Sequence, residues 1–248
     1  MKPKLLDLFC GAGGCSMGYQ RAGFDVTGVD IAPQPHYPFE FHQADALTFP
    51  LEGFDAIHAS PPCQAWSVAS ELHRRAGKKY QDCLTPIRER LRSRGGIWVI
   101  ENVPRAPIQP YAIQLCGLMF GLKVFRHRLF QLSHLIPPPL HPSHVGLRVG
   151  DGYFSVAGSG GRWKSWGTVH RNVSKGTREE WRAAMGIPWM TRHELTQSIP
   201  PAYTEYIGKW LIEFIGSRSN QRMNRKPATT EVGLTSEDMR EKRISSIV

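Results

Sequence analysis

The sequence predicts an α/β protein built on a mostly parallel sheet, and three observations support this fold class. From residue 4 to residue 100, short apolar runs alternate with stretches of helical pattern. Strands separated by helical connections form crossover units, which place neighbouring strands parallel. A glycine turn, an aspartate, a cysteine and a glutamate follow directly after the apolar runs. In parallel sheets this end of the strands is where ligands bind.

Four strands and one helix are expected in this part of the chain. The strands are residues 4–9, 24–29, 54–59 and 97–100, and the helix spans about 16–22. Each strand is a short apolar run that ends in a turn or in a polar residue.

The sequence changes character beyond residue 130. Residues 136–142, Ile-Pro-Pro-Pro-Leu-His-Pro, cannot continue a helix or a central strand, so we expect a boundary there. Residues 143–176 are rich in Gly, Trp, Arg and Lys, which predicts a small irregular lobe. Regular structure is expected to resume at Thr177, a helix N-cap with Glu180 three residues later.

A further helix is expected from about Pro200 to about Ile215. From Ser217 to Val248 the chain is polar, which predicts a mobile tail with a short helix near Ser236–Lys242. Large apolar residues are few in this last segment, so it lacks the side chains for a core of its own.

Composition excludes several classes of protein. The chain has 248 residues, 41% hydrophobic and 10% aromatic, which is enough for one sizeable domain and excludes a wholly disordered chain. No apolar run reaches the length of a membrane span, about 20 residues. The first apolar run contains Asp7, so we expect no signal peptide. Five cysteines without export signals indicate reduced thiols in a cytoplasmic protein.

A glycine-rich turn, Asp-Leu-Phe-Cys-Gly-Ala-Gly-Gly at residues 7–14, joins the first strand to the first helix. Glycines let the backbone approach a ligand, and the helix that follows presents free N–H groups. The Lys-Ser/Thr pair of a P-loop is missing. Asp30 ends the next strand about 20 residues later, where a carboxylate can bind ribose hydroxyls. Either feature alone is often a tight turn or a cap, but together they favour a cofactor that contains adenosine.

Cys63 stands in Pro-Pro-Cys-Gln at the end of the third strand. The prolines stiffen the loop, so we expect the thiol to face the cleft, where a thiolate can attack an electron-poor carbon. The remaining cysteines are expected to be inert core residues; they are Cys10, Cys15, Cys83 and Cys116. The sequence predicts no metal site, because it has no Cys-x-x-Cys or clustered Cys/His spacing.

Glu101 follows the fourth strand directly, in Glu-Asn-Val. Burial there would raise its pKa and let it hold or donate a proton near neutral pH. In Arg126-His127-Arg128, strand alternation would place both arginines on one side and His127 on the other. By itself that pattern is typical of a solvated strand edge.

Together these motifs resemble those of the cytosine-5 DNA methyltransferases. DLFCGAGG is similar to the family's cofactor motif, PPCQ to its catalytic loop, ENV to its glutamate motif and RHR to the end of its arginine motif. The order and approximate spacing agree as well. The resemblance covers residues 4–132 and resumes over 177–215, where MGIPWM and SIPPAYTEYIG are similar to the family's closing motifs.

The resemblance implies a Rossmann-like methyltransferase sheet with helices on both faces, a small target-recognition lobe, and S-adenosylmethionine as cofactor. Phe9, Gly11 and Gly13 would surround the methionine moiety, Asp30 would bind the ribose and Asp45 the adenine. The full set of cofactor-binding candidates is Asp7, Phe9, Gly11, Gly13, Gly14, Asp30, Ile31, Asp45 and Pro61. The implied regions are a catalytic and cofactor-binding core (1–135), the target-recognition lobe (136–176), the C-terminal part of the core (177–216) and the tail (217–248).

The implied reaction is transfer of a methyl group to carbon 5 of a cytosine flipped out of double-stranded DNA. Cys63 would attack carbon 6, and Glu101 would hold or protonate ring nitrogen 3. Arg128 would steady the carbonyl of the base and Arg126 the cysteine loop. We expect a monomer in the cytoplasm of a bacterial or phage-infected cell; restriction-linked protection, orphan marking and phage self-protection all fit the sequence.

Charge supports a nucleic-acid partner. The chain has 31 Lys and Arg against 21 Asp and Glu, a formal net charge of +10. A dense basic run follows the Cys63 loop, and we expect it to contact phosphates although such runs are usually solvated faces; it comprises Arg74, Arg75, Lys78, Lys79, Arg88, Arg90, Arg92 and Arg94. The lobe is a second candidate DNA surface, with Arg148, Arg162, Lys164, Arg171 and Lys175 interleaved with Tyr153, Phe154, Trp163 and Trp166.

The chain departs from the family pattern at a few positions. Val124 stands where the arginine motif opens with Gln, and Thr196-Gln197 stand where the closing motif has Gly-Asn. Trp66 replaces the commoner Phe after the catalytic loop. The lobe is short for a target-recognition region. These departures concern contacts of the cofactor and of the catalytic loop, and they leave open a methyl donor other than unmodified S-adenosylmethionine. They leave Cys63 and Glu101 in place.

Three alternatives stay open at the level of sequence. The first is methylation of cytosine in RNA, which a small recognition lobe permits. The second is a catalytically silent DNA-binding relative, although such a protein has no chemical need for the cysteine, the glutamate and the glycine loop together. The third is a nicotinamide-dependent oxidoreductase, which the lack of Gly-x-Gly-x-x-Gly spacing disfavours.

Overall fold

The chain divides into two units, Met1–Ile215 and Gly216–Val248, and the first unit contains the sheet. The computed structural model describes residues 1–108, 110–156, 163–165, 168–170 and 176–224. Within these residues, no helix combines the length and the apolar composition that a membrane span requires.

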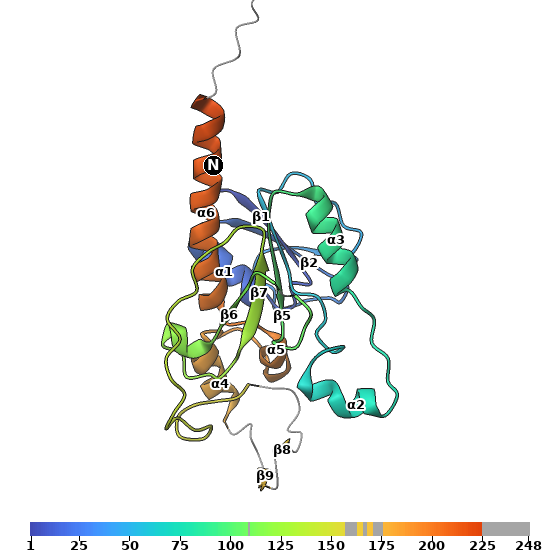
Figure 1. The fold of residues 1–248 in the computed structure, drawn as a ribbon, viewed down its shortest axis with the longest axis vertical. Helices are drawn as coiled ribbons and strands as arrows, with labels where there is room; N and C mark the ends of the chain where they lie inside the picture. The colour runs from blue at the N-terminus through green and yellow to red at the C-terminus, as the bar shows by residue number, and fades with distance from the viewer. Residues whose placement is uncertain (109, 157–162, 166–167, 171–175, 225–248) are drawn as a thin grey trace, which may run out of the picture. The chain divides into compact units, whose positions relative to one another are not determined.

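A seven-stranded sheet forms the centre of the first unit, in the order β3-β2-β1-β4-β5-β7-β6 (Figure 1). Strands β3, β2, β1, β4 and β5 run parallel, and β7 is antiparallel to both of its neighbours. The strands are β1 (Lys4–Leu8), β2 (Asp25–Asp30), β3 (Glu40–Gln43), β4 (Ala56–Ala59), β5 (Ile97–Asn102), β6 (Ala112–Leu115) and β7 (Arg128–Leu132). The mostly parallel sheet predicted from the sequence is therefore confirmed.

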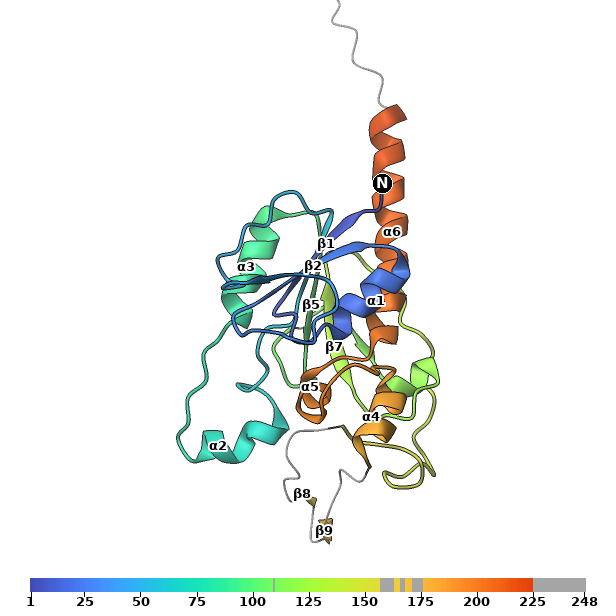
Figure 2. The ribbon, with the colours of Figure 1, turned by 180° about the vertical axis from the view of Figure 1, so that it is seen from behind.

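Helices cover both faces of this sheet, with α1 and α6 on one face and α3 on the other (Figures 1 and 2). The helices are α1 (Gly14–Ala22), α2 (Glu71–Arg75), α3 (Leu84–Arg94), α4 (Arg178–Met185), α5 (Arg192–Gln197) and α6 (Pro201–Asn224). Together with the strand order, this arrangement is the predicted Rossmann-like α/β fold.

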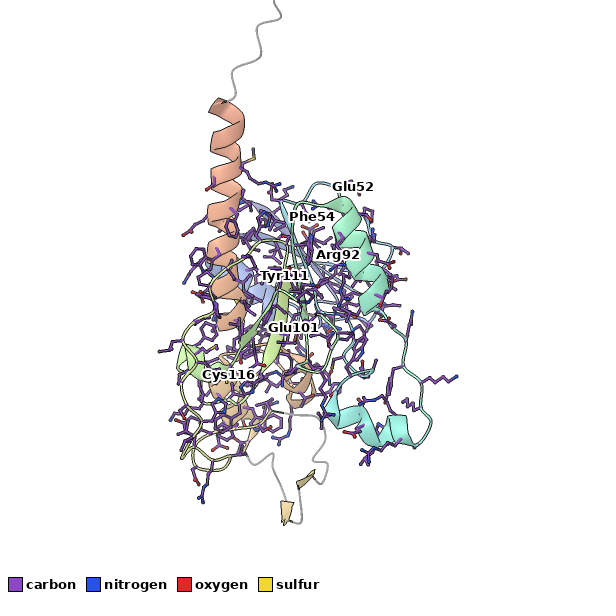
Figure 3. All side chains as sticks on the ribbon, in the orientation of Figure 1. Glu52, Phe54, Arg92, Glu101, Tyr111 and Cys116 are labelled. Carbon is purple, nitrogen blue, oxygen red and sulfur yellow. The ribbon has the colours of Figure 1, made fainter. Side chains whose placement is uncertain are left out.

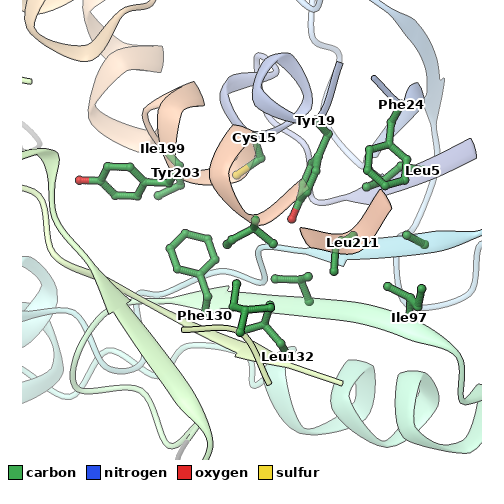
Figure 4. Close-up of a cluster of buried hydrophobic side chains, with 14 of the residues drawn as sticks. Leu5, Cys15, Tyr19, Phe24, Ile97, Phe130, Leu132, Ile199, Tyr203 and Leu211 are labelled. Carbon is green, nitrogen blue, oxygen red and sulfur yellow. The ribbon is translucent and has the colours of Figure 1, made fainter. Parts of the chain in front are cut away.

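The core follows from these two layers. On one face Tyr19 of α1 and Leu211 of α6 pack against the sheet beside Phe130 of β7, all nearly inaccessible to solvent (Figure 4). On the other face α3 buries Leu84 and Ile87 against the sheet. A helix that presents apolar residues at this spacing packs one stripe on the sheet and leaves its other side exposed.

The antiparallel strand β7 brings its first residues to the edge of the sheet at which the parallel strands end. Its first residue, Arg128, pairs with Leu115 at the end of β6, and Leu129 pairs with Asn102 at the end of β5. The start of β7 therefore lies beside the carboxyl ends of its neighbours. This is how the Arg-His-Arg segment comes to the same edge as the glycine turn.

The predicted helix start at Thr177 is confirmed. The Thr177 hydroxyl accepts from the Glu180 N–H at 3.1 Å, and the Glu180 carboxylate accepts from the Thr177 N–H at 2.7 Å. Both bonds satisfy N–H groups that the first helical turn leaves unpaired.

The predicted end of the last helix at Ile215 is wrong. Helix α6 continues to Asn224, because Gly216 is accommodated within it and no proline follows until Pro227. The expected tail therefore begins as helix, and its predicted short helix near 236–242 lies outside the described residues. The sequence also missed several elements: β3, α2, α3, β6 and α5.

The segment expected to be an irregular lobe contains a short antiparallel pair, β8 (Trp163–Ser165) with β9 (Thr168–His170). Before it, Tyr153 stacks on Phe125 with ring centroids 5.3 Å apart, and Phe154 packs into the core cluster that contains Trp181. These two aromatic rings contact other side chains and are partly buried, and their assignment to a DNA surface stays a prediction. Arg162, Trp166, Arg171 and Lys175 lie outside the described residues.

Close approach of α1 to α6 gives a test of the fold. A Cβ atom on Gly18 would come within 2.1 Å of both Pro201 O and Thr204 Oγ1. We expect Gly18→Ala to lower the free energy of unfolding by about 1–3 kcal/mol, measured by urea denaturation. Gly216→Ala is the control, since its Cβ meets nothing within 4 Å, and it should be neutral or stabilising. Equal stability of the two variants would contradict this packing.

Candidate active site

A cavity of about 670 Å³ lies at the carboxyl ends of the parallel strands. Most of the predicted site residues line it: Asp7, Phe9, Gly11, Gly14, Asp30, Ile31, Asp45, Pro61, Cys63, Glu101 and Arg128. Residues from six separate segments therefore meet at one place, as the strand-end argument predicted. Gly13 and Arg126 are not among the lining residues.

The glycine turn is held open by the aspartate that ends β2. The Asp30 carboxylate accepts from the Gly11 N–H at 3.0 Å and from the Ala32 N–H at 3.0 Å. Phe9 and Gly11 both have positive φ, 59° and 49°, so the backbone bends sharply as it leaves β1. A Cβ atom on Gly11 would meet nothing within 4 Å, so the space in front of this backbone belongs to the cavity.

Gly13 serves the turn rather than the cavity. It is the N-cap of α1 with φ of 85°, a left-handed conformation that glycine adopts without strain. A Cβ atom there would lie 3.0 Å from Tyr37 and from Pro38. The prediction that Gly13 touches the cofactor is therefore not supported by its position.

Asp7 is fully buried behind the turn. Its Oδ2 atom accepts from the Ser16 hydroxyl, which in turn accepts from the Tyr37 hydroxyl at 2.8 Å. Burial raises the Asp7 pKa to about 7, and the Ser16 hydrogen bond acts in the opposite direction. Its Oδ1 atom has no partner in the protein, although Asp7 lines the cavity. A buried acceptor without a partner is costly, which favours a donor supplied by a ligand.

Cys63 lies on a loop that two side chains brace. The Asn102 side-chain amide donates to Pro61 O at 2.9 Å, and Asn102 Oδ1 accepts from the Val103 N–H at 2.9 Å. Beyond the cysteine, Arg74 donates to Gln64 O at 2.7 Å and to Ser67 O at 2.8 Å. Neither bracing role was predicted from the sequence, although Asn102 stands next to Glu101 in the quoted motif.

The surroundings of Cys63 have opposing effects on the pKa of its thiol. Burial raises the Cys63 pKa, while the positive charges of Arg128 and Arg126 lower it and the charge of Glu101 raises it. The thiol is half-buried, unlike Cys10 and Cys15, whose pKa values burial raises much further. This contrast agrees with the expectation that Cys63 is the reactive cysteine and that Cys10 and Cys15 are inert.

Glu101 and Arg128 form a buried ion pair beside Cys63. Arg128 Nε lies 3.1 Å from Glu101 Oε1, and the Glu101 side chain is 8% exposed. Burial raises the Glu101 pKa, against the lowering effects of Arg128 and of a hydrogen bond to Ser60. The carboxyl is therefore easier to protonate than an exposed glutamate, as the sequence predicted.

A buried chain of hydrogen bonds connects Tyr19 to Glu101 through His58 and Ser60. Tyr19 Oη lies 2.8 Å from His58 Nδ1, and His58 Nε2 lies 2.9 Å from Ser60 Oγ. Burial lowers the His58 pKa to about 3, so the ring is neutral at ordinary pH. The phenol then donates to Nδ1, Nε2 donates to Ser60, and Ser60 donates to Glu101.

Arg126 is buried and bound within the protein, which overturns its interpretation as part of a solvated strand edge. Its guanidinium donates to Val156 O and to Thr196 O, the latter at 2.9 Å, while its own carbonyl accepts from Tyr203 Oη at 2.6 Å. Burial and the neighbouring Arg128 lower the Arg126 pKa to about 9. Arg126 thus positions the start of β7 instead of lining the cavity.

The C-terminal helices close the site. Trp189 Nε1 donates to Ala12 O of the glycine turn at 2.9 Å, and His36 Nδ1 lies 2.8 Å from Glu194 Oε1. His193, Glu194, Gln197, Ser198 and Ile199 all line the cavity. At the predicted departures, Val124 is fully buried, and Thr196 supplies the carbonyl that holds Arg126.

Much of the basic run after the Cys63 loop is bound internally. Arg90 donates to Phe49 O, Arg94 to Phe54 O at 2.6 Å and Arg88 to Pro107 O, so these guanidinium groups fasten α3 to neighbouring loops. Arg74 braces the Cys63 loop. The expectation of eight phosphate contacts is therefore too broad. The exposed members are Arg75, Lys78, Lys79 and Arg92, and the first three lie in or directly after α2.

Asn102 provides a test of how the Cys63 loop is held. Asn102→Ala removes both hydrogen bonds, so we expect the free energy of unfolding to fall by about 1–3 kcal/mol. We also expect iodoacetamide to alkylate Cys63 several-fold faster, as measured by peptide mass spectrometry. Asn102→Asp keeps the acceptor for Val103 but sets an oxygen against Pro61 O, and it should also speed alkylation. Wild-type alkylation rates in both variants would contradict the bracing role.

Part of the chain is similar to proteins of known family. Residues 3–106 match the model of the C-5 cytosine-specific DNA methylases. The Type II methyltransferase M.FnuDI of Fusobacterium nucleatum is 35% identical over 79 residues, 28% of this chain and 23% of that protein. M1.HphI of Haemophilus parahaemolyticus is 35% identical over 88 residues, with the same two shares. The chain thus matches less than a quarter of the length of these two curated relatives.

Solved structures agree in fold over most of the chain. The S. pombe Dnmt2 methyltransferase superposes with a TM-score of 0.57 at 14% identity, covering 86% of this chain and 99% of that one. The Entamoeba histolytica methyltransferase EhMeth gives a TM-score of 0.54 at 14% identity, covering 87% and 99%. Residues 3–106 are thus similar to the C-5 cytosine-specific DNA methylases, and the fold of the first unit agrees with that of solved methyltransferases.

Proposed function

We propose that the protein transfers a methyl group from S-adenosylmethionine to carbon 5 of cytosine in double-stranded DNA. One observation carries this proposal: Cys63, Glu101 and Arg128 line the same cavity as the glycine turn and Asp30. A nucleophile, a carboxyl with a raised pKa and a cofactor cradle are the three parts that this reaction needs. The relatives named above are Type II methyltransferases, which supports the same reaction.

The residues present fit S-adenosylmethionine. The backbone of the turn around Gly11 faces open space in the cavity. The Asp30 carboxylate can accept further hydrogen bonds from hydroxyl groups, and Asp7 Oδ1 has no donor in the protein. Phe9, Gly11 and Gly14 would hold the methionine part, Asp30 the ribose and Asp45 the adenine. When bound, the cofactor supplies an electrophilic methyl group.

Cys63 and Glu101 would activate the base together. The Cys63 sulfur forms a bond to carbon 6, and the carbon 5–carbon 6 π pair forms a double bond between carbons 4 and 5. The carbon 4–nitrogen 3 π pair moves to nitrogen 3, which takes a proton from Glu101. Carbon 5 then becomes nucleophilic, as in an enamine. After carbon 5 gains the methyl group it loses its proton to a base, and the returning electron pair expels the Cys63 thiolate.

The two arginines would have separate roles. Arg128 faces the cavity beside Glu101 and would donate to the carbonyl oxygen of the base. Arg126 holds the start of β7 through Thr196 and Val156, so it would act through Arg128 and not by touching the base. Both positive charges favour the thiolate of Cys63.

Duplex DNA would approach the end of the sheet that carries this cavity. A cytosine inside a base stack cannot reach a buried thiol, so the base must be flipped out. In Figure 1, α2 lies at the same end of the sheet as α4 and α5, and α2 and its following loop bear the exposed Arg75, Lys78 and Lys79. These cations would contact phosphates on one side of the cavity.

Cys63→Ser tests the nucleophile. The hydroxyl of serine is a far weaker nucleophile at neutral pH, so we expect no detectable methyl transfer. Binding of S-adenosylmethionine, measured by isothermal titration calorimetry, should stay within a few-fold of wild type because Cys63 attacks the base and does not hold the cofactor. Loss of cofactor binding would indicate a structural cysteine instead.

Glu101→Gln tests the proton donor. Glutamine keeps the size and a hydrogen bond to the base but supplies no proton, so we expect turnover to fall about 10²–10⁴-fold. DNA affinity, measured by fluorescence anisotropy, should change little. Glu205→Gln is the matched control, a partly exposed carboxylate paired with Lys209 on α6, and it should retain wild-type turnover. Near-normal activity of Glu101→Gln would remove Glu101 as the donor.

The substrate is tested by incubating the protein with S-adenosylmethionine and mixed-sequence duplex DNA, followed by sequencing for modified cytosines. We expect 5-methylcytosine in one short sequence context. A parallel incubation with transfer RNA separates the alternatives: methylation of RNA alone would replace DNA as the substrate. No modification of either would indicate a silent DNA-binding protein.

A further inference from the structure

Four metal-ligating side chains from separate parts of the sequence converge beside the active end of the sheet. Cys116, His127, His141 and His144 each present one ligand atom, and these atoms all lie within 4.8 Å of one another. The sequence predicted no metal site because its Cys and His residues are not closely spaced. Folding, rather than spacing, brings these four together.

The sheet topology explains the convergence. Leu115 of β6 pairs with Arg128 of β7, so Cys116, one residue after β6, comes opposite His127, one residue before β7. Past β7 the proline-rich segment returns over the same place and adds His141 and His144. Figure 3 labels Cys116 beyond Glu101, on the side away from α2, so the cluster is separate from the catalytic cavity.

Two of the distances between the ligand atoms match the edges of a tetrahedral zinc site, and all of them lie within 4.8 Å. Zinc–sulfur bonds of about 2.3 Å and zinc–nitrogen bonds of about 2.0–2.1 Å give tetrahedral edges of about 3.3–3.4 Å between nitrogens and about 3.5–3.6 Å between sulfur and nitrogen. Here His127 Nε2 and His141 Nε2 are 3.2 Å apart, and Cys116 Sγ and His144 Nε2 are 3.5 Å apart. Both pairs already stand near coordination geometry.

The protonation of the cluster also suits a metal ion. His141 Nδ1 donates to Pro142 O at 2.8 Å, which leaves the lone pair on Nε2, the atom that faces the cluster.

Packing of neutral rings alone is the competing explanation. His127, His141 and His144 do stack, with ring centroids 4.9–5.4 Å apart. Stacking, however, does not require the ring nitrogens to converge on one point, nor a fully buried cysteine to stand beside them. Thiolate with imidazole is the ligand set that tetrahedral Zn²⁺ prefers.

We propose that Cys116, His127, His141 and His144 bind one Zn²⁺ ion as a closed, structural site. Four protein ligands complete a tetrahedron, so no position stays open for catalysis. His127 lies between Arg126 and Arg128, whereas His141 and His144 begin the segment that leads toward β8 and β9. The ion therefore fastens the entry of the proposed recognition lobe to the strand that carries the catalytic arginine.

Metal content tests the proposal without any activity assay. The full chain, purified without a histidine tag, should contain about one zinc ion per molecule by inductively coupled plasma mass spectrometry. His141→Asn removes an exposed ligand with little effect on the core, and we expect its zinc affinity to fall at least about 100-fold. His42→Asn, an exposed histidine on β3, is the control and should retain wild-type zinc.

Cobalt substitution distinguishes ligation from a structural role. The chain stripped with a chelator and titrated with Co²⁺ alone should show the visible absorption of tetrahedral cobalt together with a thiolate-to-cobalt charge-transfer band. Cys116→Ser should lose that band, with folding checked by circular dichroism. A folded wild-type chain with neither zinc nor the cobalt spectrum would overturn the proposal. So would equal zinc content in His141→Asn and wild type, which would identify an adventitious ion elsewhere.

Discussion

The ion pair between Glu101 and Arg128 is the interaction on which the rest of the site depends. It joins the end of parallel strand β5 to the start of β7, the strand that is antiparallel to both of its neighbours. Burial alone would force Glu101 to stay protonated, and a buried guanidinium without a partner would be equally costly. Paired, each keeps the other in place, and both stay next to Cys63. The carboxyl can therefore exchange a proton while the positive charge favours a thiolate.

Several neighbouring groups restrain the Glu101–Arg128 pair and the Cys63 loop. The buried His58 is linked to Glu101 through Ser60. Asn102 holds the loop before Cys63, and Arg126 anchors the start of β7 to the C-terminal helices. The site is thus built from backbone-anchored groups, which keeps the reacting atoms in register without help from the surface. The proposed zinc ion would add one more restraint on β7, at His127, on the side away from the cavity.

Local patterns in the sequence were sufficient to predict the glycine turn and the helix cap, but not the contacts between residues far apart in sequence. The strand, glycine turn and helix around Gly11 could be predicted because neighbouring residues determine them, as could the Thr177 cap. The roles of basic residues could not, because whether Arg90 meets a phosphate or a carbonyl depends on how α3 packs against loops far away in sequence. The pairing of Cys116 with His127 was hidden for the same reason, since it follows from strand order.

Covalent trapping tests most directly whether Cys63 attacks carbon 6 of cytosine. In duplex DNA with 5-fluorocytosine in place of cytosine, carbon 5 carries fluorine, which cannot leave as a cation, so the final elimination is blocked. With S-adenosylmethionine present, peptide mass spectrometry should find the Cys63 peptide bonded to a methylated fluorocytosine nucleotide. An adduct on another cysteine, or no adduct under conditions where ordinary DNA is methylated, would contradict this mechanism.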